Sequence, residues 1–493
     1  MSFTKYREFY KRIQNFRDIQ SLLQWDSEVM MPSSGRMARS HQIAEMSKLI
    51  HELFTGDEFK HLLDRAEEDI SRNSNYNNID FKKKELKVIQ ERLDKQSKLP
   101  TAFVQELSQK TNIAQAKWEE AKGKKDFSLF SSTLEELVDL AIRQADYYGY
   151  EKERYDALLD DYEKSATGES LAKLFQDLKK ELIPIVSNAK SYPNPFTKKV
   201  PPALQKVFCE SIPTFLGLTS DLSRLDSSAH PFSTSLGPKD KRITTRYDES
   251  DPLSSIFGIM HETGHSLYEV GLSEIQEAPH PIAEYLSLGM HESQSRLWEN
   301  QVGRSEEFWQ FYYPLALKAW NLKESELPFE KLIQSIRSVE KTKIRVEADP
   351  VTYNLHIILR FEIERDLIAQ KIKVTDLPDI WNAKMKESFD LTIDHPAEGV
   401  LQDVHWSMAA FGYFPTYALG NIYSAQLYSA FLKSDPNFPK TLANSGNTSS
   451  LLSWLKRNVH HQGKLLSVDE LIEKATGSKP SSRFLVESLT NFR

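Results

Sequence analysis

Apolar residues recur at three- and four-residue spacings along most of the chain, which is the pattern of amphipathic helices. The first such stretch, residues 3–24, places Phe9 and Ile13 on one side, and we expect it to end at Trp25-Asp26. Similar periods predict further helices over residues 36–53, 57–68, 79–96, 101–122, 128–149 and 169–188.

Two stretches interrupt this pattern. Residues 191–202 are rich in proline, which fixes φ and removes an N–H donor, so we place a lobe boundary of a single domain, 1–493, there. Residues 242–247, Arg-Ile-Thr-Thr-Arg-Tyr, are β-branched and aromatic and predict a short strand. Helical patterns then continue to the end of the chain. The pattern therefore predicts the all-α class, with a small β element.

Composition narrows the possible functions. The chain has 63 Lys and Arg against 70 Asp and Glu, a net charge of −7, and no basic block, which argues against nucleic acid as a partner. Its single cysteine, Cys209, excludes an internal disulfide framework and a Cys-rich zinc module. We see no signal-peptide pattern and no apolar run long enough for a membrane span, so we expect a cytoplasmic protein.

One predicted helix, residues 256–270, carries candidate chemistry. We expect Ser254 or Ser255 to cap its start and Gly271 to end it. His261 and His265 lie four residues apart, so both imidazoles point to the same side of this helix.

Two imidazoles on one helical turn supply half of a tetrahedral zinc site. Glu262 cannot bind the same ion with them, but it can reach a metal-bound water, as in the H-E-x-x-H arrangement. The competing interpretation is a surface helix with two unrelated histidines.

A third ligand should follow on a second helix. Residues 289–300 offer Glu292, with His291 and Glu299 as rivals by composition, and Glu299 could also be a solvated helix residue. Three protein ligands leave one position for a water whose pKa the ion lowers. Glu262 would take the proton as that water attacks a carbonyl and would then deliver it to the leaving amine, which amounts to hydrolysis of a peptide bond.

Further motifs extend over most of the chain. In order they are His230-Pro231-Phe232, Asp240-Lys-Arg242-Ile-Thr244, His291-Glu292-Ser293-Gln294, Ile344-Arg345-Val-Glu-Ala348-Asp349, Gly399-Val-Leu-Gln402-Asp403-Val-His405-Trp406 and Phe411–Gly420. With the His261–His265 helix, they make the chain resemble the carboxypeptidase Taq family of thermostable metallocarboxypeptidases. The chain departs from the family pattern at residues 274–285 and 408–410, which could alter the cleft wall.

The resemblance implies roles for particular residues. Glu292 becomes the third metal ligand, Arg345 the anchor of the substrate's C-terminal carboxylate, and Tyr417 its helper. His405 would lie near the scissile carbonyl, and either His405 or Tyr413 would donate to the oxyanion. An arginine fork matches a carboxylate well. From spacing alone, however, Arg345 could instead pair with Asp349 four residues along the same helix.

Other residues are expected to support the site. Asp240 and Arg242 precede the metal helix and would order the strand lining the groove, with Arg242 contacting substrate. Asp403 would either orient a metal-binding imidazole or cap a helix. Asp349 is placed in the same supporting layer.

The resemblance also implies the larger picture. The fold would be mainly helical, with a small β-sheet beside a deep groove between two lobes, similar to neurolysin and the angiotensin-converting enzymes. The protein would be a homodimer that binds one divalent ion per chain, zinc or alternatively cobalt. It would release single amino acids, with broad specificity, from peptides with a free C-terminus. Two alternatives are an oligoendopeptidase or dipeptidyl carboxypeptidase, and a non-catalytic peptide-binding protein.

Overall fold

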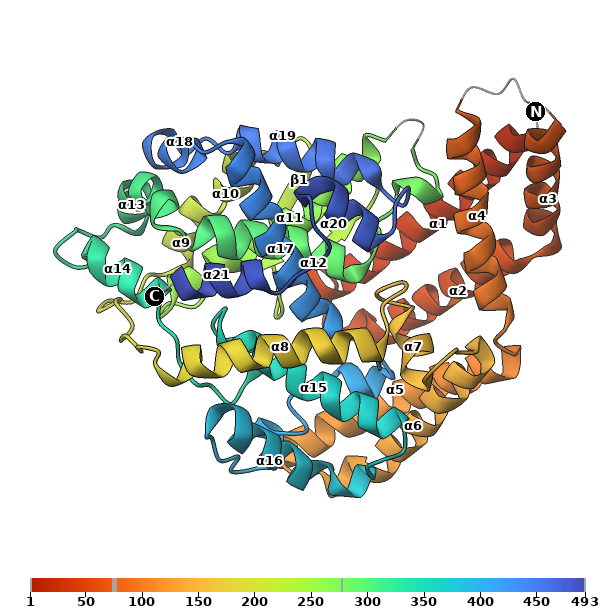
Figure 1. Ribbon diagram of the computed structural model, residues 1–493, viewed down its shortest axis with the longest axis horizontal. Helices are drawn as coiled ribbons and strands as arrows, with labels where there is room; N and C mark the ends of the chain where they lie inside the picture. The colour runs from red at the N-terminus through yellow and green to blue at the C-terminus, as the bar shows by residue number, and fades with distance from the viewer. Residues whose placement is uncertain (1, 73–77, 276–277, 492–493) are drawn as a thin grey trace.

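The N-terminal helices form a unit with its own apolar core. The computed structural model describes residues 2–72, 78–275 and 278–491. The first four helices lie at one end of the molecule (Figure 1) and share a core that includes Tyr6, Phe59 and Ile89. They are α1 (Ser2–Val29), α2 (Arg36–Thr55), α3 (Asp57–Arg72) and α4 (Ile79–Ser97).

The predicted end of the first helix at Trp25-Asp26 is wrong. The indole of Trp25 is buried, and Asp26 makes a 2.6 Å ion pair with Arg39 of α2, so packing carries α1 on to Val29.

The rest of the described chain is built around a second, continuous core that runs from Phe103 to Leu489. Below the centre of Figure 1 lie α5 (Thr101–Lys124), α6 (Ser128–Tyr148), α7 (Arg154–Leu159), α8 (Gly168–Ser187), α15 (Thr352–Ile368) and α16 (Leu377–Phe389). The remaining outer helices lie above the centre of Figure 1 or to its left. They are α9 (Pro202–Cys209), α10 (Ile212–Leu216), α13 (Glu306–Trp320), α14 (Phe329–Ile336), α18 (Phe438–Ser445), α19 (Ser449–Asn458), α20 (Val468–Thr476) and α21 (Arg483–Asn491). This core crosses residues 191–202 without a break, and a lobe boundary there stays a prediction.

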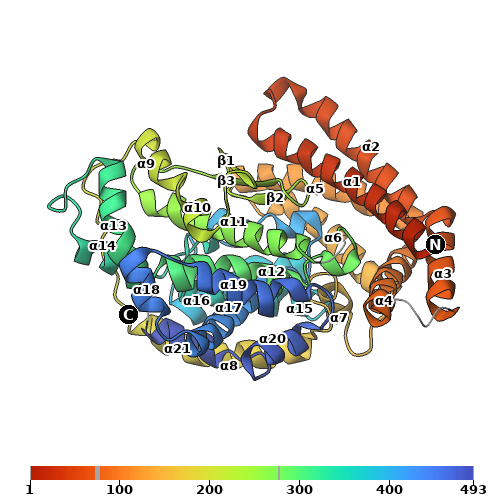
Figure 2. The same ribbon diagram turned by 90° about the horizontal axis from the view of Figure 1, so that it is seen from above.

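A small sheet packs against the central helices. Its order is β1 (Ser223–Ser227), β3 (Lys241–Thr245) and β2 (Ser233–Ser235), with β1 parallel and β2 antiparallel to β3. The run predicted to be a strand forms β3, whereas β1 and β2 were not anticipated. Figure 2 shows the sheet beside α11 (Pro252–Ser273). The prediction of a mainly helical fold with a small sheet is confirmed.

Three helices cross at the centre: α11, α12 (Leu288–Arg296) and α17 (Pro415–Ser434). Glycines allow this close approach. A Cβ on Gly264 of α11 would lie 2.5 Å from the carbonyl oxygen of Gln294, and a Cβ on Gly420 of α17 would lie 2.4 Å from Cγ of Glu292. Helix α12 is therefore held between two helices whose backbones lie unusually near it.

The predicted ends of the central helix need correction. Helix α11 begins at Pro252, after Asp251, because proline suits the first helical turn and needs no N–H partner there. It also runs past Gly271, which keeps a helical backbone and gives His460 room, since a Cβ would lie 2.4 Å from Nδ1 of that histidine. No helix among the described residues is long and apolar enough to cross a membrane.

Candidate active site

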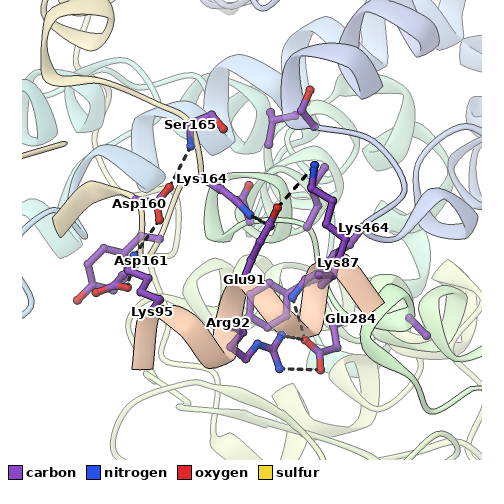
Figure 3. Close-up of a pocket in the computed structure, with 18 of the residues that line it drawn as sticks. Lys87, Glu91, Arg92, Lys95, Asp160, Asp161, Lys164, Ser165, Glu284 and Lys464 are labelled. Carbon is purple, nitrogen blue, oxygen red and sulfur yellow. Dashed lines mark hydrogen bonds and ion pairs between the residues drawn. The ribbon is translucent and has the colours of Figure 1, made fainter. Parts of the chain in front are cut away.

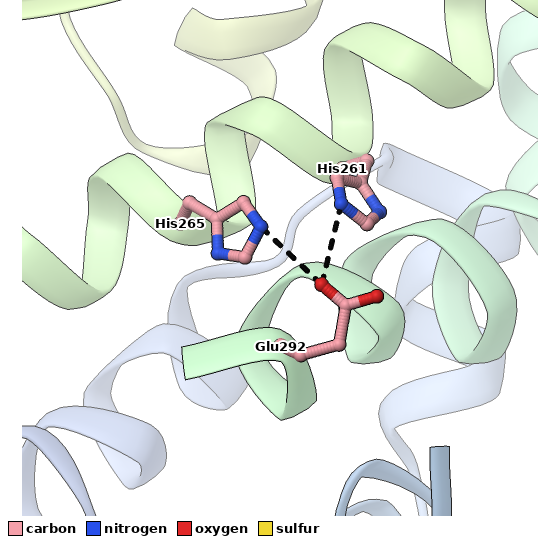
Figure 4. A group of neighbouring side chains, drawn as sticks. All are labelled: His261, His265 and Glu292. Atoms are coloured by element: carbon pink, nitrogen blue, oxygen red, sulfur yellow. Dashed lines mark ion pairs between the residues drawn. The ribbon is translucent and has the colours of Figure 1, made fainter. Parts of the chain in front are cut away.

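Three side chains from two helices meet at one point (Figure 4). His261 and His265 lie one turn apart on α11, and Glu292 of α12 faces them. Oε2 of Glu292 lies 3.5 Å from Nε2 of His261 and 3.4 Å from Nε2 of His265. One ligand atom from each side chain falls within 4.8 Å of the other two. Two imidazole nitrogens and one carboxylate oxygen match the donor set of a catalytic zinc site, so these residues could hold a divalent ion.

The surroundings set the protonation of these ligands. Burial lowers the pKa of His265 to about 3, which leaves the neutral imidazole that a metal requires. Burial would raise the pKa of Glu292, but Arg296 and His261 outweigh it and hold that pKa well below its usual range. At His261 the nearby carboxylates of Glu292 and Glu299 outweigh burial and raise the pKa, so a metal would compete there with a proton.

Glu299 orients one of the imidazoles. It lies on the π-helical turn Leu297–Gly303 that extends α12, and its Oε2 is 2.9 Å from Nδ1 of His261. A carboxylate on Nδ1 places the proton there and leaves the Nε2 lone pair for a metal. Both earlier interpretations of Glu299, as a ligand and as a solvated residue, are wrong, because it is buried behind the histidine.

His291 lies outside the ligand group. Its Nε2 is 3.0 Å from Oε1 of Glu269, and its ring stacks on the ring of His265 at 4.4 Å between centroids. His291 therefore packs beside His265, and its position does not support the prediction that it is a rival ligand.

Gly420→Ala is expected to weaken metal binding, because the new methyl group would collide with Cβ and Cγ of Glu292, 2.7 and 2.4 Å away, and push that carboxylate from the histidines. We expect a loss of at least about tenfold in metal affinity, as for other perturbed metal sites. Gly123→Ala on α5 is the matched control, since nothing lies within 4 Å of the added methyl group. Metal titration of both variants checks this, and equal affinities would contradict it.

Glu262 follows the first histidine and is buried beside the sheet. Only 7% of the residue is exposed, and burial raises the pKa of its carboxyl to about 7. It hydrogen-bonds with Ser233 of β2 and lies outside the ligand group. The position leaves this carboxyl free to exchange a proton next to the candidate metal.

Arg345 is held in a fixed orientation. It is 7% exposed and lies on a short 3-10 turn, Arg345–Glu347. Its Nε donates to Oδ1 of Asp403 at 2.9 Å, and its Nη1 donates to the hydroxyl of Tyr353 at 3.0 Å. The guanidinium lies 5.1 Å from the ring centroid of Tyr417.

Two sequence interpretations near Arg345 are therefore wrong. Asp349 does not pair with it, because the chain is not helical across 345–349 and Asp349 instead accepts from the backbone N–H groups of Val351 and Thr352 at the start of α15. Asp403 orients no metal-binding imidazole and caps no helix, because Arg345 and Arg360 occupy its two oxygens.

His405, Tyr413 and Tyr417 form an aromatic group next to the arginine. Nε2 of His405 lies 3.1 Å from the Tyr417 hydroxyl, and the ring of Tyr413 lies 5.3 Å from both other rings. Burial lowers the pKa of His405 to about 4 and raises the pKa of Tyr413 to about 12, so both are neutral near pH 7. A neutral imidazole and a phenol can each donate to a developing oxyanion.

The two halves of the site are linked by Arg296 and Tyr353, which sequence reasoning missed. Nε of Arg296 donates to Oε1 of Glu292 at 2.7 Å, and its guanidinium lies 4.5 Å from the ring centroid of Tyr353. The same tyrosine receives the hydrogen bond from Arg345. The i, i+4 spacing of Glu292 and Arg296 was a usable signal for this contact.

Arg242 lies on β3, and Asp240 directly precedes that strand. Oδ2 of Asp240 accepts from Nη2 of Arg242 at 2.9 Å, and the guanidinium lies 4.8 Å from the ring centroid of Trp25 in α1. This pair ties β3 to the N-terminal helices, whereas a contact of Arg242 with substrate stays a prediction.

A cavity of about 1630 Å³ lies between the body and the N-terminal helices. Its lining includes Glu269, one turn beyond His265 on α11, and residues of α1 and α4. Figure 3 shows Glu284 in this lining with Arg92 of α4 and Lys464. Glu284 is ion-paired with both and also receives a hydrogen bond from Tyr10 of α1. The lining includes none of His261, His265 and Glu292, so the chemistry of the candidate ligand group, and not the cavity, locates the site.

Comparison with known proteins agrees with this geometry. The model of the carboxypeptidase Taq (M32) metallopeptidase family matches residues 5–492. Carboxypeptidase 1 of Bacillus subtilis is 37% identical over 98% of this chain and 97% of its own length. Thermostable carboxypeptidase 1 of Pyrococcus furiosus is 38% identical over 97% of this chain and 95% of its own length.

Solved structures show the same likeness. A structure of the Pyrococcus furiosus carboxypeptidase superimposes with a TM-score of 0.94 at 36% identity, covering 100% of this chain and 98% of that one. An M32 carboxypeptidase from Deinococcus radiodurans gives a TM-score of 0.94 at 31% identity, covering 99% and 98%. The chain therefore belongs to the carboxypeptidase Taq (M32) family and is a metallocarboxypeptidase.

Proposed function

We propose that this enzyme removes single amino acids from the free C-terminus of peptides. His261, His265 and Glu292 would hold one divalent ion, and Arg345 would bind the substrate's terminal carboxylate. The observation that carries this proposal is a buried, oriented guanidinium linked to the ligand group through Tyr353 and Arg296. A cation at that place fits a carboxylate one residue beyond the scissile bond.

When bound, the ion would activate a water and polarise the scissile carbonyl. Glu262 would accept the water's proton and pass it to the leaving amine, since its carboxyl is buried beside the ligands and binds none of them. Neutral His405 or Tyr413 would donate a hydrogen bond to the oxyanion, and Tyr417 would hold His405 in place.

Further parts of the proposal rest on the family resemblance. They are zinc as the ion, with cobalt as the alternative, broad side-chain specificity and a homodimer. A cytoplasmic location is proposed on the sequence pattern alone.

His265→Ala is expected to lose the bound metal and, with it, peptidase activity. The substitution removes one of three protein ligands, and alanine supplies no replacement donor. Metal analysis of the purified variant checks this. His461→Ala is the control, because that exposed histidine pairs with Glu274 away from the ligand group. Full metal occupancy with wild-type turnover in His265→Ala would overturn the ligand assignment.

A further inference from the structure

The candidate carboxylate anchor contains more positive than negative charge. The anchor cluster, defined here as Arg345, Arg360 and Asp403, has two guanidiniums and one carboxylate. Nε of Arg345 donates to Oδ1 of Asp403 at 2.9 Å, and Nε of Arg360 donates to Oδ2 at 2.7 Å. Within the described part of the chain, Asp403 is the only carboxylate at ion-pair distance from either guanidinium.

Arg360 cannot reach a substrate. It lies on α15, is 0% exposed, and its guanidinium is 4.7 Å from the ring centroid of Trp381. Burying a cation is costly unless a counter-charge offsets it, and here the counter-charge is shared. Burial and the nearby Arg345 lower the pKa of Arg360, but an arginine keeps its proton in proteins.

The neighbours of the cluster do not neutralise it. His405 and Tyr417 carry no negative charge near pH 7, because burial lowers the pKa of His405 to about 4 and raises the pKa of Tyr417 well above its usual value. Glu364, four residues along the helix from Arg360, accepts instead from Nε1 of Trp406 at 2.9 Å and from the N–H of Gly412 at 3.0 Å.

We propose that Arg360 is a positioning residue that sets the charge of the anchor: by occupying one oxygen of Asp403, it leaves one positive charge in the cluster for the peptide's C-terminal carboxylate to balance. Without Arg360, Asp403 would neutralise Arg345 and compete with the substrate. This inference rests on the proposed function, because that function supplies the C-terminal carboxylate that Arg345 would bind.

The test compares one peptide with a free or an amidated C-terminus and measures kcat and KM separately. Arg360→Met makes the cluster neutral, and we expect KM for the free acid to rise roughly 10- to 100-fold, with little change for the amide. Arg360→Lys keeps the charge and should retain most of the preference for the free acid over the amide. The double variant Arg360→Met/Asp403→Asn restores one net positive charge and should recover the preference.

The matched control is Arg365→Met, which removes an equal charge from the same helix where Arg365 pairs with Glu153. Metal content and thermal unfolding are measured for every variant. If Arg360→Met does not fold, Arg360→Gln, which keeps donors for Asp403 without the charge, takes its place.

Two outcomes overturn the inference alone. In the first, Arg360→Met keeps the wild-type KM for the free acid. In the second, the double variant prefers the free acid over the amide even less than Arg360→Met does, while Arg345→Ala abolishes that preference. In either case Arg360 serves the fold only. Equal cleavage of acid and amide by the wild-type enzyme overturns the proposed function as well.

Discussion

Glu262→Gln is expected to keep the bound metal and to lose about 10²- to 10⁴-fold in turnover, the usual contribution of a general base. Glutamine preserves the shape of the side chain, and Glu262 is not one of the metal-binding group. It cannot accept a proton from the attacking water, however, so the variant lacks the proposed base.

Metal analysis and peptide hydrolysis on the same preparation check this result. Glu85→Gln is a suitable control, because Glu85 is also fully buried but lies in the separate core of the N-terminal helices and pairs with Arg7. We expect that variant to keep its turnover. Cleavage by Glu262→Gln near the wild-type rate would show that another group accepts the proton.

Amidation of the substrate's C-terminus is expected to lower kcat/KM by roughly 30- to 5,000-fold. The amide lacks the charge that the guanidinium of Arg345 would pair with, so the excess positive charge of Arg345, Arg360 and Asp403 stays unbalanced, at a cost of about 2–5 kcal/mol. Arg345→Ala should make the two substrates nearly equal by damaging cleavage of the free acid alone.

Mass analysis of the products adds an independent readout, because single residues should leave one at a time from the free end. Metal content must be unchanged in Arg345→Ala, otherwise the loss says nothing about the anchor. Internal cuts as first products, or equal rates for acid and amide in the wild type, would favour an endopeptidase.

Much of the fold was predictable because helices leave a local signature. The periods for α2 to α6 and for α8 match the observed bounds closely, since each of these helices buries one face along its own length, whereas the six-residue helix α7 was not predicted. Strands β1 and β2 were missed because Ser233–Ser235 and Ser223–Ser227 are short and polar and become strands only by pairing with β3. Gly271 was wrongly predicted to end its helix, because a glycine that allows a close approach looks, in sequence, like a glycine that ends a helix.

The site was predictable to a similar degree. His261 and His265 follow from spacing within one helix, whereas Glu292 needed the family resemblance to separate it from its rivals. The partnership of Glu299 with His261, 38 positions apart, and that of Arg360 with Asp403, 43 positions apart, depend on how helices pack. No local pattern carries that information.

The separate apolar core of α1 to α4 has a consequence for how such an enzyme can diversify. These helices line one wall of the cavity, yet the side chains of their core belong to a different cluster from those around the metal ligands. Replacements inside the N-terminal core therefore act on this wall of the cavity before they reach the cluster that surrounds α11 and α12. The shape of the cavity wall and the packing around the candidate metal ligands are thus encoded in different parts of the chain.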